Sequence, residues 1–329
     1  MGIMERGSTF SAKVKDELAR VYPEKDCCRL AELAAITRLD GSVIIGSDDS
    51  VGLRITTEYS AAARKIYRLL KDRFGVEGEV TVIRQNRLKK RAQYRITVKP
   101  SDKTPGILRI LGLLSAGGHI RPGIKKDLIK NKCCCQSYLR GVFLGCGSVS
   151  GLDSGYHLEL TADSERLGGD IADLINRFPS LQAKLIRRKQ ACLVYLKESS
   201  QIADFLTIVG AHGSLLEFEN ARVLKGVKNQ VNRIVNCETA NIGKTADAAV
   251  KQIQSIRLID ERLGLDILES TLAQVARLRL ENPESNLKEL GEIMTPPLGK
   301  SGVNHRFRKL IDFAQNLRDM TDRTDARTE

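Results

Sequence analysis

A stretch of this chain recurs 106 residues further on, and this repeat limits the possible folds more than any other feature of the sequence. Residues 33–43 read LAAITRLDGSV, and residues 139–149 read LRGVFLGCGSV. Both copies follow an apolar helical pattern with small residues inside it, and both end in Gly-Ser, where a glycine commonly closes a helix. Self-similarity at a fixed distance indicates two copies of one structural unit.

The segments that follow each copy also correspond. After the first copy we expect two strands in residues 42–58, a helix at 60–74, a hairpin at 80–99 and an apolar helix at 105–114. After the second copy we expect two strands in residues 148–163, a helix at 164–178, a hairpin at 184–197 and a helix at 200–209. Each half is therefore predicted to have the order αββαββα, which is an α+β fold with two antiparallel sheets.

This order, headed by a small-residue helix that ends in Asp-Gly or Gly-Ser, resembles the fold of the LAGLIDADG homing endonucleases. The resemblance implies that the two motif helices pack together at a pseudo-twofold axis, where Gly and Ala let the backbones approach closely. It also implies that the two sheets form a saddle over the DNA major groove. Basic residues of the two hairpins would lie on this saddle: Arg84, Arg87, Lys89, Lys90 and Arg91 in the first, and Lys184, Arg187, Arg188 and Lys189 in the second.

The distribution of charge favours this interpretation over ordinary solvated hairpin tips. The chain has 53 Lys and Arg against 40 Asp and Glu, a net charge of +13. Residues 1–214 hold 35 basic and 23 acidic residues, whereas residues 215–329 hold 18 and 17. A basic excess of this size points to a polyanionic partner, most often nucleic acid. We expect that partner to be double-stranded DNA.

This chain has an acid at only one of the two positions that carry catalytic acids in LAGLIDADG nucleases. Those enzymes need one carboxylate at the foot of each motif helix to hold divalent metal ions. The corresponding residues here are Asp40 and Cys146, and a thiolate is a poor ligand for Mg²⁺. We therefore expect a scaffold kept for binding, with no catalytic residue, metal or cofactor, and with Asp40 facing water at a helix end. Residual metal binding by Asp40 is the alternative.

The eight cysteines show no zinc-binding spacing. Cys27-Cys28 and Cys133-Cys134-Cys135 are adjacent runs, and no C-x-x-C sequence occurs. We expect thiols that pack as small apolar residues beside helix starts, with a metal or redox site as the alternative. The chain also lacks an apolar run long enough to span a membrane and an apolar leader segment. A cytoplasmic protein without membrane contact is the expected result.

The last third of the chain changes to a helical pattern. Two long helices are expected at 215–235 and 244–263, with a polar stretch at 239–243 between them. Three shorter helices are then predicted at 270–281, 287–294 and 302–317. Asn286 and Glu289 form a capping-box pattern before the second of these, and Ser301 is expected to cap the third. The core stripe of the third helix comprises Val303, Phe307, Leu310, Ile311 and Ala314.

Two helices joined by a short turn, the second polar and basic at its start, are typical of a helix-turn-helix. Asparagine can pair with adenine and arginine with guanine, and Lys300 and Arg306 suit phosphates. The predicted DNA-binding residues are Asn286, Lys288, Lys300, Ser301, Gly302, Asn304, His305, Arg306, Arg308 and Lys309. A plain amphipathic helical hairpin would show the same spacing and is the alternative.

The sequence NLKELGEIMTPPLGKSGVNHRFRKL at 286–310 is similar to the helix-turn-helix of the WhiA family, which fuses a degenerate LAGLIDADG domain to such a motif. The segments FSAKVKDELARV at 10–21 and NCETANIGKTADAAVKQI at 236–253 also match. The resemblance implies a bacterial DNA-binding regulator linked to cell division, chromosome segregation and, in some lineages, sporulation. Asp40 is a departure, because members of the family commonly lack an acid there.

Together these features predict four regions: a first LAGLIDADG-like half at 1–120, a second at 121–213, linker helices at 214–263 and a helix-turn-helix domain at 264–329. The expected function is sequence-specific DNA binding without catalysis, near the nucleoid, with other transcription factors or RNA polymerase as further partners. The alternatives are a metal-dependent nuclease and an RNA-binding, maturase-like scaffold. A helix-turn-helix argues against RNA, because the A-form major groove is too narrow for a recognition helix. An aromatic content of 5% without Trp also provides few platforms for stacking bases.

Overall fold

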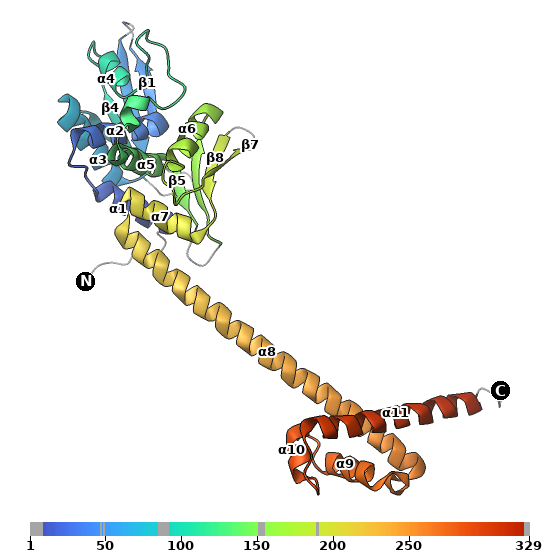
Figure 1. Ribbon diagram of the computed structural model, residues 1–329. Coiled ribbons are helices and arrows are strands. Elements are labelled where there is room, and N and C mark those ends of the chain that lie inside the picture. Colours follow the sequence, from blue (N-terminus) through green and yellow to red (C-terminus); the bar gives the residue numbers. More distant parts are fainter. Residues whose placement is uncertain are drawn as a thin grey trace. The chain divides into compact units, whose positions relative to one another are not determined.

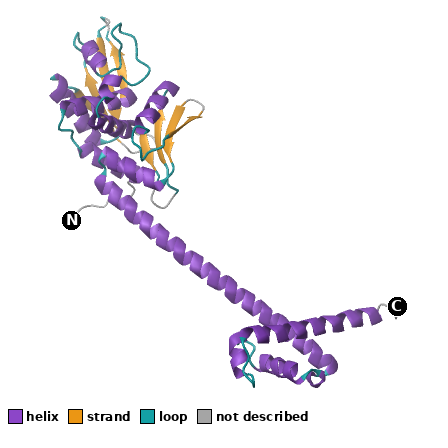
Figure 2. Ribbon diagram, in the orientation of Figure 1, coloured by secondary structure: helices purple, strands orange, loops and turns teal. Residues whose placement is uncertain are grey.

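The computed structural model describes residues 9–46, 48, 50–84, 92–150, 155–188 and 191–325. The chain divides into two compact units, residues 1–226 and residues 227–329 (Figure 1). The first unit combines helices with antiparallel sheets, and the described residues of the second are helical with connecting loops (Figure 2). The predicted α+β class, followed by an all-helical region, is confirmed. No helix within the described ranges is long and apolar enough to cross a membrane.

The first unit contains the duplicated order of elements that the repeat predicted. Its first half comprises α1 (Phe10–Arg20), α2 (Asp26–Asp40), β1 (Gly41–Ile45), β2 (Val51–Thr57), α3 (Ser60–Phe74), β3 (Glu79–Arg84), β4 (Ala92–Val98) and α4 (Thr104–Ile110). Its second half comprises a 3-10 turn, η1 (Lys126–Ile129), then α5 (Lys132–Cys146), β5 (Gly147–Val149), β6 (Leu158–Ala162), α6 (Glu165–Ile175), β7 (Lys184–Arg188), β8 (Ala191–Leu196) and α7 (Ser199–Val209).

The two sheets have the same topology. The first has the order β1-β2-β4-β3 and the second the order β5-β6-β8-β7, with every neighbouring pair antiparallel. Ile55 faces Ile96 across the first sheet, and Leu160 faces Val194 across the second; all four side chains are fully buried. Because side chains alternate along a strand, one face of each sheet packs against helices and the other faces outward.

Helices α2 and α5 pack side by side at the centre of the unit (Figure 1). A Cβ atom added to Gly141 would lie 2.5 Å from the Glu32 carbonyl oxygen and 2.8 Å from the Ala35 Cβ atom. One added to Gly145 would lie 3.0 Å from the Leu39 Cβ atom. The backbones therefore approach too closely for larger side chains at Gly141. This confirms the small-residue contact that the LAGLIDADG resemblance implied.

A buried group of charges holds the elements around this helix pair. The Glu32 side chain on α2 has no exposed surface and forms ion pairs with Lys65 of α3 and Arg140 of α5. Lys65 also donates to the Leu18 carbonyl oxygen at 2.8 Å, and Arg140 donates to the Val209 carbonyl oxygen at 2.6 Å. Buried charges require partners of this kind, so the network links α2 and α5 to α1, α3 and α7.

The region from residue 212 to residue 263 differs from the sequence prediction. Two helices with a polar break at 239–243 were expected, but this region forms one helix, α8 (His212–Leu263), of 52 residues. The helix contains no proline, and each of its interior glycines, Gly226 and Gly243, costs only about 1 kcal/mol relative to alanine. The polar stretch is exposed but remains helical, and the Thr245 hydroxyl donates to the Asn241 carbonyl oxygen at 2.8 Å.

The second unit packs the last turns of α8 against η2 (Leu265–Ile267), α9 (Ser270–Glu281), α10 (Leu287–Ile293) and α11 (Lys300–Asp325). Its buried core includes Ile256, Ile259, Val275, Leu290, Val303, Phe307 and Leu310. The end of α8 is therefore part of this core. Helix α11 is longer than the predicted 302–317, and Ser301 lies within it instead of capping it. The helix starts earlier because the Gly299 carbonyl oxygen accepts from the Gly302 and Val303 amides, at 2.9 and 3.1 Å.

Candidate nucleic-acid interface

Helices α10 and α11 form the predicted pair joined by a short turn. The Leu298 amide donates to the Gly291 carbonyl oxygen at 2.8 Å, which closes this turn. A Cβ atom on residue 291 would lie 2.0 Å from the Leu298 carbonyl oxygen, so only glycine allows α10 and the turn to approach so closely. This close approach sets the position from which α11 leaves the turn.

The start of α10 carries the capping box that the sequence indicated. The Asn286 side-chain oxygen accepts from the Lys288 and Glu289 amides, at 2.9 and 3.1 Å. The Glu289 carboxylate accepts from the Asn286 amide at 2.9 Å. Asn286 is thus engaged in the cap, although it was also predicted as a DNA contact. Lys288 is exposed, and its Nζ atom lies 3.8 Å from a Glu292 carboxylate oxygen.

The two sides of α11 differ sharply in exposure. Val303, Phe307, Leu310 and Ala314 are buried, and Ile311 is half-buried, as the predicted core stripe requires. The predicted DNA-binding residues lie elsewhere on the helix. Lys300, Ser301, His305, Arg308 and Lys309 are exposed, whereas Gly302, Asn304 and Arg306 are half-buried. The first three turns of α11 therefore present a polar and basic surface beside a firmly packed apolar side.

Arg279 of α9 is a buried residue that supports this surface and that the sequence analysis did not single out. Its side chain is 2% exposed, and its Nε atom donates to the Gln252 side chain of α8 at 3.0 Å. Its Nη1 atom donates to the Ser285 carbonyl oxygen at 2.6 Å, and its guanidinium lies 5.2 Å from the Phe307 ring centroid. Burial lowers the pKa of Arg279 from its usual value. This arginine therefore ties α8, α9 and α11 together.

The hairpin residues predicted to contact DNA are described only in part. Lys184, Arg187 and Arg188 lie on β7 and are exposed. Arg84 ends β3, but its side chain is outside the described residues, as are Arg87, Lys89, Lys90, Arg91 and Lys189. Lys184 faces Tyr195 and Arg188 faces Ala191 across the β7–β8 pair, so both are on the same face of the second sheet.

The outward face of the first sheet provides basic residues that the sequence analysis missed. Arg54 on β2 and Arg95 on β4 alternate with buried neighbours, and both are half-buried. Arg54 faces Thr97, and Arg95 faces Thr56 on one side and Thr81 on the other. The two arginines on this face thus come from β2 and β4, with threonines beside them on β2, β3 and β4. The alternation in LRITT and YRITV is the sequence signal for these two positions.

The feet of the two motif helices, Asp40 on α2 and Cys146 on α5, provide only one acid between them. Asp40 is half-buried at the end of α2, and burial raises its pKa to about 6. It lines a pocket of about 290 Å³ together with Lys15, Thr56, Thr57, Glu58, Tyr59, Gln93, Leu144 and Gly145. The prediction that Asp40 simply faces water is therefore wrong. The Cys146 thiol, at the end of α5, donates to the Val142 carbonyl oxygen at 3.3 Å.

Lys15 of α1 supplies a positive charge at this place. Its side chain is buried, with its Nζ atom 5.4 Å from the Tyr59 ring centroid. Burial lowers the pKa of Lys15, and the neighbouring Asp40 carboxylate opposes that shift. An ammonium beside the carboxylates of Asp40 and Glu58 offsets their charge and would repel a divalent cation. The pair of carboxylates that holds the metal ions of a LAGLIDADG nuclease is therefore replaced by a carboxylate, a thiol and a lysine.

Three family models match successive parts of the chain. They are the WhiA N-terminal LAGLIDADG-like domain at residues 26–114, the WhiA LAGLIDADG-like domain at 135–228 and the WhiA C-terminal HTH domain at 231–314. A protein named probable cell division protein WhiA from Heliobacterium modesticaldum is 46% identical over 93% of this chain and 96% of its own. The protein of the same name from Desulforamulus reducens is 48% identical over 94% and 96%.

Among solved structures, the chain is similar to full-length DUF199/WhiA from Thermatoga maritima. The TM-score is 0.57 with 26% sequence identity, and the match covers 94% of this chain and 99% of that one.

Proposed function

The chain belongs to the WhiA family, and from this premise we propose that it is a sequence-specific DNA-binding protein that regulates transcription and does not cleave DNA. The relatives it matches are named probable cell division proteins. We extend that role to this chain, and include chromosome segregation and sporulation as processes that its target genes serve. Contact with other transcription factors or RNA polymerase stays a prediction.

The observation that carries the proposal is the division of α11 into a buried apolar side and an exposed polar side at its start. Helix α11 would lie in the major groove with His305, Arg308 and Asn304 toward the base edges. Exposed Lys300 and Lys309 would contact phosphates on either side. The packing of Phe307 against Arg279 supports this arrangement, because it fixes the rotation of α11 within the second unit.

The first unit would contribute contacts to the DNA backbone. The described candidates are Lys184 and Arg188 on one face of β7 and the outward-facing Arg54 and Arg95 of the first sheet. The predicted Arg187 is exposed but lies on the other face of β7, where it pairs with buried Cys192. Each cation that neutralises a phosphate releases a condensed counterion, so this part of the binding should depend strongly on salt and little on sequence. Specificity would then come mainly from α11.

The absence of nuclease activity rests on the chemistry at the feet of the motif helices. Hydrolysis of a phosphodiester by this fold needs hard oxygen ligands for divalent metal ions. Asp40 provides one carboxylate, whereas Cys146 provides a thiol and Lys15 a competing cation. Burial raises the pKa of Cys146 to about 12, so a neutral thiol occupies the second position at neutral pH.

Mapping of chromosomal binding in the source organism, followed by titration of the recovered sites, tests the proposal. We expect enrichment at a limited set of promoter regions that share a sequence motif, and intact duplex after incubation of the full chain with such a site and Mg²⁺ or Mn²⁺. Uniform enrichment along the chromosome would contradict sequence-specific binding. Nicking that is lost in Asp40→Ala would contradict the non-catalytic assignment and favour a nuclease.

A further inference from the structure

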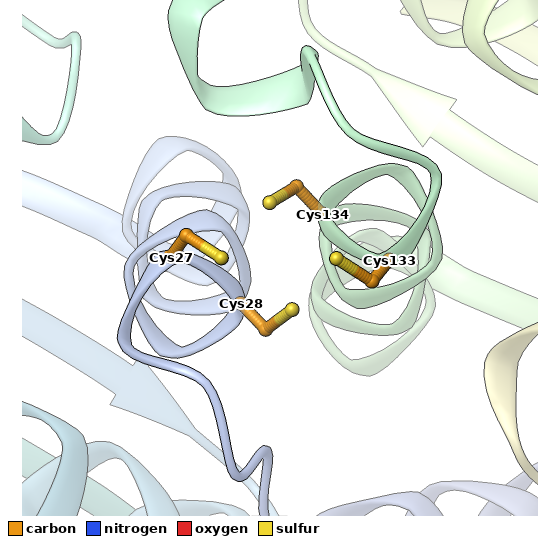
Figure 3. Close-up of side chains that lie close together, drawn as sticks. All are labelled: Cys27, Cys28, Cys133 and Cys134. Carbon is orange, nitrogen blue, oxygen red and sulfur yellow. The ribbon is translucent and has the colours of Figure 1, made fainter.

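Four cysteine side chains that are far apart in the sequence converge in the first unit. Cys27 and Cys28 lie in the first turn of α2, and Cys133 and Cys134 lie in the first turn of α5. Their four Sγ atoms all lie within 4.8 Å of one another. Figure 3 shows the two pairs pointing from their helices into the space between the helix starts. A search for C-x-x-C motifs therefore misses this cluster, because its members come from two distant segments of the chain.

The cluster follows the internal symmetry of the domain. Cys133 comes 106 residues after Cys27, and Cys134 comes 106 residues after Cys28, which is the same offset that relates the two motif helices. A pseudo-twofold axis between α2 and α5 brings equivalent positions of two facing helices together. The duplicated Cys-Cys pair thus produces four thiols at one point, although each half alone contributes only two.

We propose that Cys27, Cys28, Cys133 and Cys134 bind a single Zn²⁺ ion as a tetrathiolate site. Zinc takes four cysteine sulfurs in a tetrahedron with Zn–S bonds of about 2.3 Å, which places the sulfurs about 3.8 Å apart. The sulfurs here lie within 4.8 Å of one another, so a contraction of about 1 Å suffices to reach that geometry. Rotation about the Cα–Cβ bonds provides movements of this size.

The surroundings suit a site of net negative charge. Neither helix start is capped by a side chain of the described residues, because the N-cap positions are Lys25 in α2 and Asn131 in α5 and neither makes a side-chain cap. The positive ends of both helix dipoles lie at these helix starts, where the four cysteines are, and favour thiolates. Lys25, which precedes α2, adds a cation that acts on Cys133.

Burial is graded across the cluster. Cys28 and Cys134 are buried, at 5% and 3% exposure, whereas Cys133 is half-buried and Cys27 is exposed. A metal ion can enter from the side of Cys27 and become enclosed by the two inner sulfurs. Four ligands from protein complete a tetrahedral shell, so the site is of the structural type, with no open position for a substrate.

The spacing disfavours the other uses of four cysteines. An iron–sulfur cubane places its four ligands around a cluster of several atoms, which requires wider separation than a single ion. Disulfides would join the sulfurs in pairs at about 2.05 Å, whereas all four cysteines are free thiols in the structure. A mononuclear site uses all four sulfurs at once. It would also join the starts of α2 and α5, at the opposite helix ends from Asp40 and Cys146.

The zinc site can be tested on the full chain without DNA, so the result does not depend on the proposed function. The protein is purified with a reducing agent, and its metal content is measured by mass spectrometry. The purified protein is then depleted of metal with a chelator and titrated with Zn²⁺ and with Co²⁺. The test variant is Cys27→Ser/Cys133→Ser, which leaves the two buried cysteines in place. Cys237→Ser, an exposed cysteine on α8, is the matched control.

We expect a single zinc ion per chain in the unaltered protein and in Cys237→Ser, and a loss of at least about tenfold in zinc content in the double variant. Co²⁺ should give the visible absorption of a tetrahedral tetrathiolate complex, and Zn²⁺ should displace it. The circular dichroism spectrum of the double variant shows whether it has folded. If it has not, the Co²⁺ spectrum of the unaltered protein decides the number of thiolate ligands.

Three results would overturn the proposal. The first is unaltered, reduced protein that binds neither Zn²⁺ nor Co²⁺ in competition with a chromophoric chelator. The second is a folded double variant that retains its full zinc content. The third is a cluster that contains iron and sulfide, or a disulfide between α2 and α5, in the protein as purified.

Discussion

Replacement of Glu32 with Gln should destabilise the first unit far more than its small chemical change implies. Gln has nearly the same shape as Glu, so the substitution leaves no cavity and removes mainly a charge. That charge is fully buried and paired with two cations, Lys65 at 1% and Arg140 at 11% side-chain exposure. Breaking a buried pair by neutralising one partner typically costs about 3–5 kcal/mol, because the remaining charge stays buried without compensation.

The hydrogen bonds that remain around Arg140 and Lys65 do not replace the lost charge of Glu32. After the substitution, Arg140 keeps its hydrogen bond to Val209 at 2.6 Å, and Lys65 keeps its hydrogen bond to Leu18 at 2.8 Å. Neither carbonyl oxygen carries a full charge. Burial lowers the pKa of Lys65, and Glu32 is the main group that opposes this shift. Lys65 can therefore lose its proton in the variant, which limits the cost and makes it smaller at higher pH.

Urea denaturation of the full chain measures this effect selectively. The chain has no Trp, and all seven Tyr residues lie between residues 22 and 195, so tyrosine fluorescence reports only the first unit. Glu217→Gln is the control, because Glu217 forms an ion pair with Lys13 at 2.6 Å but is 41% exposed. Exposed pairs contribute about 0–1 kcal/mol. Equal losses of stability in Glu32→Gln and Glu217→Gln would refute the argument that burial makes this charge essential.

Three further predictions concern DNA binding and pH. Arg308→Ala should lower the affinity for a specific DNA site by about 5- to 150-fold, the equivalent of about 1–3 kcal/mol for one base contact. The control Arg318→Ala, which changes an exposed residue later on the same helix, should not lower it. An equal loss of affinity for a scrambled duplex would exclude base recognition by Arg308. Reversing the charges of Lys184 and Arg188, which share one face of β7, should weaken binding to all duplexes and flatten the log–log salt dependence by about 0.9 for each phosphate that is no longer neutralised. An unchanged slope would exclude this face of β7 from the interface. Because the folded-state pKa of Asp40 is about 6 against 3.8 ordinarily, the folded state binds the extra proton, so the stability that this group contributes should fall as pH rises from about 4 to 6 and then level off. Urea titrations followed by tyrosine fluorescence should show this loss of stability in the unaltered protein and not in Asp40→Asn. The same loss in both proteins would contradict the assignment of the pH dependence to Asp40.

Local sequence patterns were sufficient for several features of the fold. The repeat at an offset of 106 predicted two αββαββα halves, and the sheets indeed share one strand order. The capping box at Asn286 and Glu289 and the buried stripe of Val303, Phe307 and Leu310 were also predicted correctly. These features succeed because each depends on residues only a few positions apart, or on a periodicity that the helix or strand itself imposes.

Helix boundaries were predicted less well, for an energetic reason. The polar residues at 239–243 were taken as a break, yet α8 continues through them. Polar residues and isolated glycines lower helical propensity by at most about 1 kcal/mol each, and flanking turns can offset this cost. Ser301 was expected to be a cap, but the helix begins two residues earlier than predicted, at Lys300, because the Gly299 carbonyl oxygen accepts the first hydrogen bonds.

The sequence by itself determined the duplication, the helix-turn-helix pattern and the two positions, Asp40 and Cys146, where nuclease chemistry would need acids. Only the tertiary structure decided what stands around them. It put Lys15 beside Asp40, placed Arg54 and Arg95 on the outward face of the first sheet, and joined two Cys-Cys pairs into one cluster. The physical reason is that spacing along a chain reports only which residues share a helix face or strand face. Which faces then meet depends on the close packing of α2 against α5, where Gly141 allows two helices from different halves to touch.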